Sequence, residues 1–235
     1  MNIELLHFNC IDSTNLEAKR RIKSGAKLPI VIVADSQTAG KGRMGRTFYS
    51  PDSTGLYMSF VYKPETDLAN SVTVTSAAAV AVVRAIEELT EHSPKIKWVN
   101  DIYIDNKKVC GILTEAVTGE KTAIIVGIGV NITTEDFPKE IEDTAVSLNT
   151  TVDKNDLLKS IISNIIKLIN GLPERTFLPE YKQKSMVIGK EVYFIKSGEA
   201  KEGRAVDINQ DGALIVETSD GFETLSTGEI TLRVK

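Results

Sequence analysis

Hydrophobic and polar residues alternate with different periods along the chain, and the first of these patterns predict strands. The segment IELLHF (3–8) is a short strand candidate, and the continuous apolar run PIVIVAD (29–35) predicts a strand that is buried. The segment GLYMSFVYK (55–63) alternates in the way of a half-buried strand. The N-terminal part of the chain should therefore supply several strands of one sheet.

Two segments between and after these strands have a helical period instead. The segment STNLEAKRRIKSG (13–25) predicts a helix, with Thr14 and Glu17 spaced as a capping box and Gly25 as the residue that stops it. The alanine-rich segment 70–91 predicts a central helix that packs against the sheet.

The middle of the chain contains strand-like runs in series. They are KIKWVNDIYI (95–104), KKVCGILTEAV (107–117) and TAIIVGIGVNI (122–132), and the segment DNKK (105–108) joins the first two as a hairpin turn. Strands that follow one another through short turns pair antiparallel. The sheet is therefore predicted to be largely antiparallel, which excludes a Rossmann sheet.

The C-terminal part begins with one more helix and then changes character. Segment 153–172 is amphipathic, with Asp153 as the expected N-cap and Gly171 as the expected stop. Its predicted inward face consists of Leu157, Leu158, Ile161, Ile162, Ile165, Ile166 and Ile169. From about residue 190 onward, short strands alternate with Gly, Asp and Asn turns, which predicts a small β-barrel.

These elements give an α+β fold, in which a mixed, largely antiparallel sheet carries helices and a small all-β module follows it. We expect one domain at residues 1–186 and a C-terminal domain at 187–235.

Composition narrows the class of protein. The chain of 235 residues is 42% hydrophobic and 26% charged, which is ordinary for a soluble protein. Its net charge of −4 provides no general field for nucleic acid. Two cysteines, no signal peptide and no apolar run near the ~20 residues of a membrane span indicate a cytoplasmic protein without a membrane partner.

One loop combines flexibility with positive charge. Residues 40–46 (GKGRMGR) hold three glycines and three cations. The spacing differs from a Walker A loop, and although Gly40, Gly42 and Gly45 match G-x-G-x-x-G, the following segment is not helical. Two interpretations stay open, a solvated surface loop or a mobile loop that folds over an anion and excludes water.

The segment KWVNDIYIDNKKVCGILTE (97–115) places many polar residues on one hairpin. Alternate residues of a hairpin often face solvent, and this explains Lys107 well. It explains WVND poorly, because Asn and Asp are depleted inside strands. Lys108 precedes an apolar run, so it could lie at the buried edge of a site where an anion meets it.

Two further motifs offer room or polar groups. Gly127 and Gly129 have the same parity, so both face one side of their strand and either admit a ligand or relieve packing. Asn131 at the same parity favours the ligand. The DSTN segment (12–15) is a helix N-cap that also exposes hydroxyl and N–H groups.

No metal-ligand cluster and no catalytic triad emerge from the sequence. His7 is expected to be a strand residue, His92 a solvent-facing residue and Cys110 a core residue.

Together these motifs resemble the biotin–protein ligases. The family pattern matches over essentially the whole chain and in order, at STN (13–15), QTAGKGRMGRTF (37–48), KWVND (97–101), KKVCGILTE (107–115), GIGVN (127–131) and GEITLR (228–233). Lys41, Phe48 and Val99 depart from the family's usual Arg, Trp and Pro. Only twelve residues precede Ser13, so the chain is similar to the short class without a DNA-binding domain, and we expect no DNA partner.

The resemblance implies a fold and a reaction. The fold is that of class II aminoacyl-tRNA synthetases and biotin ligases, with an SH3-like β-barrel at the C-terminus. The enzyme would use ATP to activate biotin as biotinyl-5′-AMP and would then transfer biotin to a lysine of a biotin carboxyl carrier protein or domain. Magnesium is expected with ATP, with Asp101 as a candidate ligand, and no metal site is assigned.

The resemblance also implies roles for residues. The catalytic residues would be Lys108 and Arg43. The biotin site would consist of Ser13, Thr14, Asn15, Gln37, Gly40, Lys41, Gly42, Arg43, Lys108, Gly111, Gly127 and Gly129. The ATP site would consist of Arg43, Arg46, Phe48, Asn100, Lys108, Asn131 and Arg233. A lipoate–protein ligase and a non-catalytic biotin sensor are the alternatives, and the sequence leaves a homodimer open.

Overall fold

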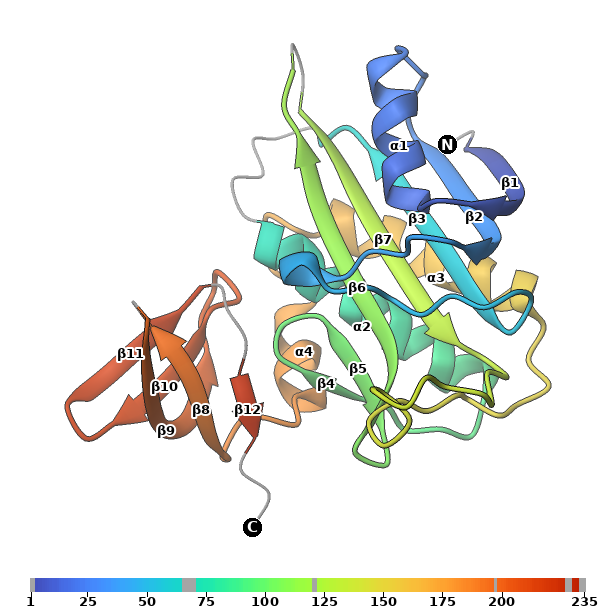
Figure 1. Ribbon diagram of the computed structural model, residues 1–235. Coiled ribbons are helices and arrows are strands. Elements are labelled where there is room, and N and C mark those ends of the chain that lie inside the picture. The colour runs from blue at the N-terminus through green and yellow to red at the C-terminus, as the bar shows by residue number, and fades with distance from the viewer. Residues whose placement is uncertain (1–2, 65–70, 120–121, 197, 227–229, 233–235) are drawn as a thin grey trace.

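The protein folds into two sheets and four helices in the part of the chain that the structure describes (Figure 1). The structure is a computed structural model, and it describes all residues except 1–2, 65–70, 120–121, 197, 227–229 and 233–235. The main sheet consists of β1 (Glu4–Ile11), β2 (Ile30–Gln37), β3 (Gly55–Tyr62), β4 (Lys95–Lys97), β5 (Asp101–Ile104), β6 (Lys107–Val117) and β7 (Ala123–Asn131). Its strand order is β1-β2-β3-β7-β6-β5-β4.

The pairing of the main sheet follows from the connections between its strands. β1 and β2 are parallel because α1 (Thr14–Lys23) crosses over between them, and all other neighbours in this sheet are antiparallel. Asp105 and Asn106 both have positive φ, 48° and 62°, as a tight β5–β6 hairpin turn requires. The predicted antiparallel series is thus confirmed.

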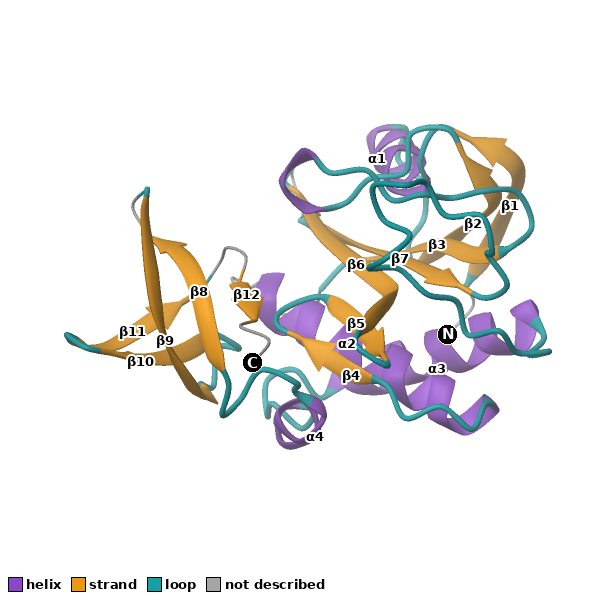
Figure 2. Ribbon diagram, turned by 60° about the horizontal axis from the view of Figure 1, so that its bottom comes forward, coloured by secondary structure: helices purple, strands orange, loops and turns teal. Residues whose placement is uncertain are grey.

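Helices cover both faces of the main sheet (Figure 2). The long helices α2 (Ser71–Leu89) and α3 (Lys154–Asn170) lie on one face, and α1 lies on the other. The alanines from Ala77 to Ala85 are buried, so this part of α2 approaches the sheet closely. Strand β7 is buried along its whole length, which explains its continuous apolar sequence. Strand β3 is also buried along its whole length, so the expectation that it is half-buried is wrong, and its polar Ser59 donates to Oδ1 of Asn15.

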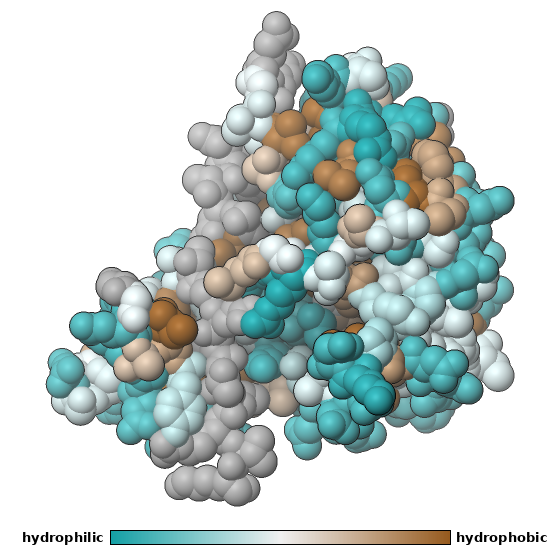
Figure 3. Space-filling view, viewed as in Figure 1, coloured by the Kyte–Doolittle hydropathy of each residue, from teal (hydrophilic) through white to brown (hydrophobic). Residues whose placement is uncertain are grey.

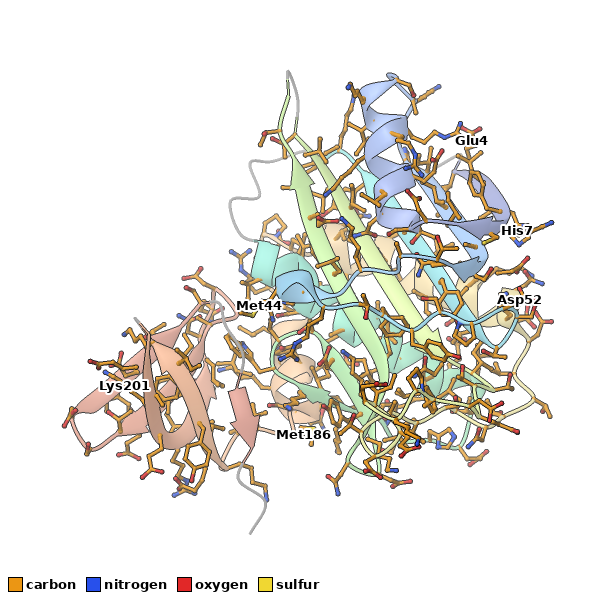
Figure 4. All side chains as sticks on the ribbon, viewed as in Figure 1. Glu4, His7, Met44, Asp52, Met186 and Lys201 are labelled. Carbon is orange, nitrogen blue, oxygen red and sulfur yellow. The ribbon has the colours of Figure 1, made fainter. Side chains whose placement is uncertain are left out.

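The C-terminal residues form a separate five-stranded sheet. Its strands are β8 (Glu191–Lys196), β9 (Glu199–Ile208), β10 (Leu214–Thr218), β11 (Gly221–Leu225) and β12 (Ile230–Leu232), in the order β11-β10-β9-β8-β12. Their neighbours pair antiparallel throughout. Met186 marks the junction with the rest of the chain (Figure 4), where its N–H donates to the carbonyl of Ile96.

Several sequence-based expectations are wrong in detail. Segment 95–104 is two strands, because the turn 98–100 satisfies its polar groups outside the ladder. The short helix α4 (Leu178–Lys184) was not predicted. His92 is half-buried, with Nε2 2.7 Å from the carbonyl oxygen of Leu148.

The predicted capping box of α1 is also wrong. Ser13 is the N-cap of α1. The N–H and the hydroxyl of Thr14 both donate to Oε1 of Gln37. The carboxylate of Glu17 instead accepts from Arg20 and Arg21, each at 2.6 Å. Thr14 therefore contacts Gln37 at the end of β2 instead of forming a capping box with Glu17.

Helix α3 confirms its predicted ends. The Asp153 carboxylate accepts from the N–H groups of Asn155 and Asp156, and Gly171 is the C-cap. Leu157, Leu158, Ile161 and Ile165 are buried as predicted, together with Leu168; the other predicted isoleucines are partly buried.

The cap of α3 gives a first testable expectation. Asp153→Ala should lower the free energy of unfolding by about 0.5–2 kcal/mol, because two helix N–H groups lose their acceptor. Urea unfolding followed by circular dichroism measures this. Asp156→Ala is the matched control, since the Asp156 side chain is exposed and caps no N–H group in the described contacts. Equal losses in both variants would contradict the capping role.

Hydrophilic residues cover most of the visible surface, and the hydrophobic ones show in small groups between them (Figure 3). Large side chains that are exposed include Leu5, Met44, Tyr49, Ile195 and Phe222. Among the described residues, no helix has the length and apolar character that crossing a membrane demands.

Candidate active site

A cavity of about 410 Å³, here called the ligand cavity, collects residues from motifs that are far apart in the sequence. It lies where the N-terminus of α1, the loop 40–48, the 98–100 turn and strands β6 and β7 meet. Of the predicted site residues, its lining includes Ser13, Thr14, Asn15, Gln37, Lys41, Gly42, Arg43, Arg46, Phe48, Asn100, Lys108, Gly111, Gly127 and Gly129.

Three predicted site residues lie elsewhere. Gly40 lines a second cavity of about 580 Å³, here called the neighbouring cavity, on the loop 39–47. Asn131 is buried outside the lining of both cavities, and its amide donates to the carbonyl oxygen of Val146 at 3.2 Å. Arg233 lies outside the described residues.

Glycines form the floor of the ligand cavity. A Cβ atom on Gly127 would lie 2.2 Å from Oδ1 of Asn15, and one on Gly129 would lie 2.4 Å from Cε1 of Phe48. Both glycines therefore face the cavity, as their shared parity predicted. The space that they leave admits the Asn15 and Phe48 side chains, which form the walls.

Asn15 is held by polar partners on two strands. Its Oδ1 accepts from the Ser59 hydroxyl at 2.6 Å, and its Nδ2 donates to Glu115 at 2.9 Å. The Glu115 carboxylate also pairs with Lys19 at 2.7 Å. A donor on one side and an acceptor on the other fix which way the amide points.

Gln37 connects α1 to the start of the glycine-rich loop. Its Oε1 accepts from the Thr14 N–H at 2.9 Å, and its Nε2 donates to the Ser50 hydroxyl at 2.9 Å. Because Thr14 and Gln37 hold each other, they present a fixed set of donors and acceptors to the cavity.

The loop 40–46 forms a short turn over the site. Its backbone closes on itself, since the Gly42 N–H donates to Arg46 O at 2.7 Å and the Arg46 N–H donates to Arg43 O at 3.1 Å. The Arg43 guanidinium donates to Oδ1 of Asn100 at 3.1 Å. Met44 has φ 54°, and its 73% exposed side chain stands on the side of the main sheet that faces the C-terminal strands (Figure 4).

Lys108 and Asp101 form an ion pair in the cavity wall. The Lys108 Nζ lies 2.8 Å from an oxygen of Asp101, and both side chains keep part of their surface exposed. Lys108 thus stands at the cavity edge, as the sequence predicted. With Lys41, Arg43 and Arg46 in the same lining, the cavity offers cations for a negatively charged ligand.

The described residues near the cavity offer few acidic side chains that could bind a metal ion. Among the described residues, no group of three or more His, Cys, Asp and Glu side chains could bind a metal ion. Magnesium usually uses one or two carboxylates together with substrate phosphates. Asp101 in the lining therefore fits a magnesium ion that arrives with a nucleotide, and no all-protein magnesium site is present in the described residues.

The nearby Cys and Tyr side chains stay protonated. Burial raises the pKa of the Cys110 thiol, and burial followed by the charge of Asp101 raises the pKa of Tyr103 to about 12. Cys110 is buried as predicted, so the described site has no thiolate nucleophile. The arrangement suits reaction between bound substrates better than attack by a protein group.

Sequence reasoning missed part of the lining. Lys97, Trp98 and Tyr103 also line the cavity, as do Ile141 and Thr144. Lys97 and Trp98 belong to the KWVND motif, which could have identified them. Ile141 and Thr144 lie in an irregular segment with no periodic pattern or motif.

Known proteins resemble this chain over nearly its whole length. Residues 7–131 match the Biotin/lipoate A/B protein ligase family, and residues 187–233 match the Biotin protein ligase C terminal domain. The Bifunctional ligase/repressor BirA of Bacillus subtilis is 32% identical over 99% of this chain and 75% of its own length. The Biotin--[acetyl-CoA-carboxylase] ligase of Mycobacterium tuberculosis is 28% identical over 93% of this chain and 85% of its own.

Solved structures agree with these relatives. The biotin protein ligase from Aquifex aeolicus in complex with biotin and ATP superposes with a TM-score of 0.85 at 29% identity, over 99% of both chains. The predicted α+β fold with a C-terminal β module is therefore confirmed. By sequence and by structure, the chain belongs to the Biotin/lipoate A/B protein ligase family.

Proposed function

We propose that the protein is a biotin–protein ligase, which activates biotin with ATP and transfers it to a lysine of a biotin carboxyl carrier domain. The observation that carries the proposal is the ligand cavity, where residues of five separated motifs place cations beside a polar pocket floored by glycines. We assign residues 1–186 to the catalytic domain and residues 187–235 to a C-terminal domain.

The first step joins two anions and therefore needs positive charge. An oxygen of the biotin carboxylate attacks the α-phosphorus of ATP, the bond to pyrophosphate breaks, and biotinyl-5′-AMP forms. Lys108 and Arg43 both line the cavity and would hold the carboxylate and the α-phosphate. Magnesium, bound to the nucleotide phosphates, would supply further charge neutralisation.

The remaining lining would orient the two substrates. Ser13, Thr14 and Gln37 offer hydroxyl, amide and N–H groups that suit the ureido ring of biotin. Arg46 and Phe48 would contact the nucleotide, since a guanidinium binds phosphate and an aromatic ring stacks on adenine. Asn131 is buried and bonded to Val146, so any contribution to the nucleotide site would act through that segment.

The second step transfers biotin to the carrier. The lysine nitrogen attacks the carbonyl carbon of the adenylate, an amide bond forms, AMP leaves with the bonding electrons, and the amine loses a proton. The adenylate hydrolyses if water reaches it. A loop that closes the cavity would protect it.

Pyrophosphate exchange tests the proposal directly. Purified protein with magnesium, ATP and labelled pyrophosphate should form labelled ATP only when biotin is present. Lipoate in place of biotin is the control for the related ligase activity. Exchange with lipoate alone would assign the chain to that chemistry, and biotin binding without exchange would indicate a sensor.

The loop 40–46 should be protected from protease by ligands. Lys41, Arg43 and Arg46 are trypsin sites, and ordering seven residues costs about 1–2 kcal/mol each in backbone entropy. The bonds of the loop to itself and of Arg43 to Asn100 offset part of this cost, and contacts to the bound anion would add to them, so the loop should open more often without ligand. Biotin with ATP should slow cleavage there strongly, and biotin alone at least partly.

Mass spectrometry of the fragments locates the cuts. Cleavage at Lys27, an exposed residue in the connection between α1 and β2 that lines neither cavity, is the internal control because it should not respond to ligand. Equal cleavage of the loop with and without ligands would contradict closure.

A further inference from the structure

The turn 98–100, between β4 and β5, contacts three different parts of the molecule. The indole N–H of Trp98 donates to the carbonyl oxygen of Gly212 at 2.9 Å, and this bond is buried. The carbonyl oxygen of Val99 accepts from the Tyr181 hydroxyl of α4 at 3.0 Å. Asn100 accepts from Arg43 of the glycine-rich loop. The turn therefore connects the C-terminal sheet to the loop over the ligand cavity.

Hydrogen bonds and a glycine conformation define the C-terminal side of this connection. Gly212 lies in the 209–213 turn before β10, where the Asn209 side chain accepts from the N–H groups of Asp211 and Ala213. Gly212 has φ +78°, and a Cβ atom there would lie 3.0 Å from Cγ1 of Val72. Only glycine fits this conformation and this close approach without strain, so the carbonyl position depends on it.

The other side of the connection reaches the cavity itself. Trp98 is 4% exposed and lines the ligand cavity, as does Asn100. Asn100 is further fixed by bonds with Ile112, whose carbonyl accepts from its side chain at 2.9 Å and whose N–H donates to its backbone oxygen at 3.0 Å. A shift of the turn would therefore move the acceptor that holds Arg43.

We propose that Trp98 is a positioning residue through which the C-terminal sheet holds the ligand cavity in its binding-competent shape. Its indole N–H ties the 98–100 turn to Gly212, and Asn100 of that turn holds Arg43 over the cavity. The inference rests on the proposed function for its kinetic readout, while its spectroscopic readout needs no turnover. Figure 1 shows the β4–β5 hairpin and α4 on the side of the main sheet that faces the C-terminal strands.

Other contacts across the same junction provide the matched control. Lys182 of α4 pairs with Asp207 of β9 at 2.7 Å, and neither residue lines either cavity. Lys182→Met removes this ion pair and keeps a long side chain. If every contact between the C-terminal sheet and the rest of the chain mattered equally for ligand binding, loss of this ion pair and loss of the Trp98 hydrogen bond would change the half-saturating concentrations equally.

The test compares Trp98→Phe, Gly212→Ala and Lys182→Met in pyrophosphate exchange. Trp98→Phe keeps an aromatic ring but loses the N–H donor together with part of the buried indole. Gly212→Ala displaces the acceptor and leaves every residue that lines the ligand cavity unchanged, although its new methyl group would meet Val72 of the neighbouring cavity. Both should raise the half-saturating concentrations of biotin and ATP about two- to tenfold, the effect of one lost neutral hydrogen bond, with kcat changed less than about twofold. Lys182→Met should leave the half-saturating concentrations at the wild-type values.

Fluorescence checks the same bond independently of activity. Trp98 is the only tryptophan of the chain, so emission reports this site alone. Gly212→Ala should shift the emission of the ligand-free protein, and Lys182→Met should not. Circular dichroism establishes that each variant is folded.

Two results would overturn the inference. One is wild-type half-saturation in Trp98→Phe and Gly212→Ala. The other is an equal rise in Lys182→Met. A wild-type protein without biotin-dependent exchange would refute the proposed function instead, and the emission shift of Gly212→Ala would still decide whether Trp98 is coupled to the C-terminal sheet.

Discussion

Replacing Lys108 by alanine should lower the rate of biotin-dependent pyrophosphate exchange at least about tenfold. A charge-assisted contact contributes roughly 1.5–3 kcal/mol, and each 1.36 kcal/mol is about a factor of ten in rate. The loss has a second part, because Asp101 is then left without the cation that lies 2.8 Å from it. An unpaired carboxylate in the wall would repel the phosphate of the incoming nucleotide.

A variant of the neighbouring Lys107 shows whether the effect depends on a positive charge in the cavity or on loss of any positive charge nearby. Lys107→Ala is the control, since Lys107 does not line the cavity and its Nζ lies 3.5 Å from the carbonyl oxygen of Glu142. A Lys108→Ala enzyme with wild-type exchange would remove this residue from the proposed catalytic group.

Replacing Gly127 by alanine should abolish measurable biotin binding and destabilise the fold by about 1–3 kcal/mol. The new methyl group would lie 2.2 Å from Oδ1 and 2.8 Å from Cγ of Asn15, so Asn15 must leave its place. It would then lose its contacts with Ser59 and Glu115, and the cavity wall would collapse. Calorimetric titration with biotin and thermal unfolding measure the two effects.

A graded series makes this prediction specific. Gly111→Ala should have a smaller effect, because the atoms nearest to its Cβ would be the flexible end of Lys108 and the edge of Phe48, at 3.1–3.2 Å. Adding Asn15→Ala to Gly127→Ala should recover the part of the stability that the clash removes, while the contacts of Asn15 with Ser59 and Glu115 stay lost. It should not recover biotin affinity, since the polar groups of Asn15 are gone too. Full biotin affinity in Gly127→Ala would show that the floor of the cavity lies elsewhere.

The parts of the fold that the sequence predicts well are those with local causes. Segment 153–170 has a helical period, a capping aspartate and a stop, and α3 forms there. β7 is a continuous apolar run because it is buried on both faces. Short turns dictate the antiparallel order from β4 to β7. The resemblance to the biotin–protein ligases, carried by the ordered motifs, predicted most of the site residues that line the cavity.

The parts that could not be predicted have distant partners. Trp98 bonds to a residue 114 positions away, and Arg43 reaches Asn100 across 57 positions, so no local pattern foretells the turn 98–100. Thr14 gives up its expected capping role because Gln37, on the paired strand, is a better partner. Helix α4 has only seven residues, too few for a period to emerge.

The glycine-rich loop lies between the ligand cavity and the neighbouring cavity and lines both of them. Lys41, Gly42, Arg43, Arg46 and Thr47 line the ligand cavity and the neighbouring cavity alike. Because this loop is the wall between them, a movement of the loop toward one cavity enlarges the other. Occupation of the ligand cavity and occupation of the neighbouring cavity are therefore coupled, and the coupling acts equally in both directions.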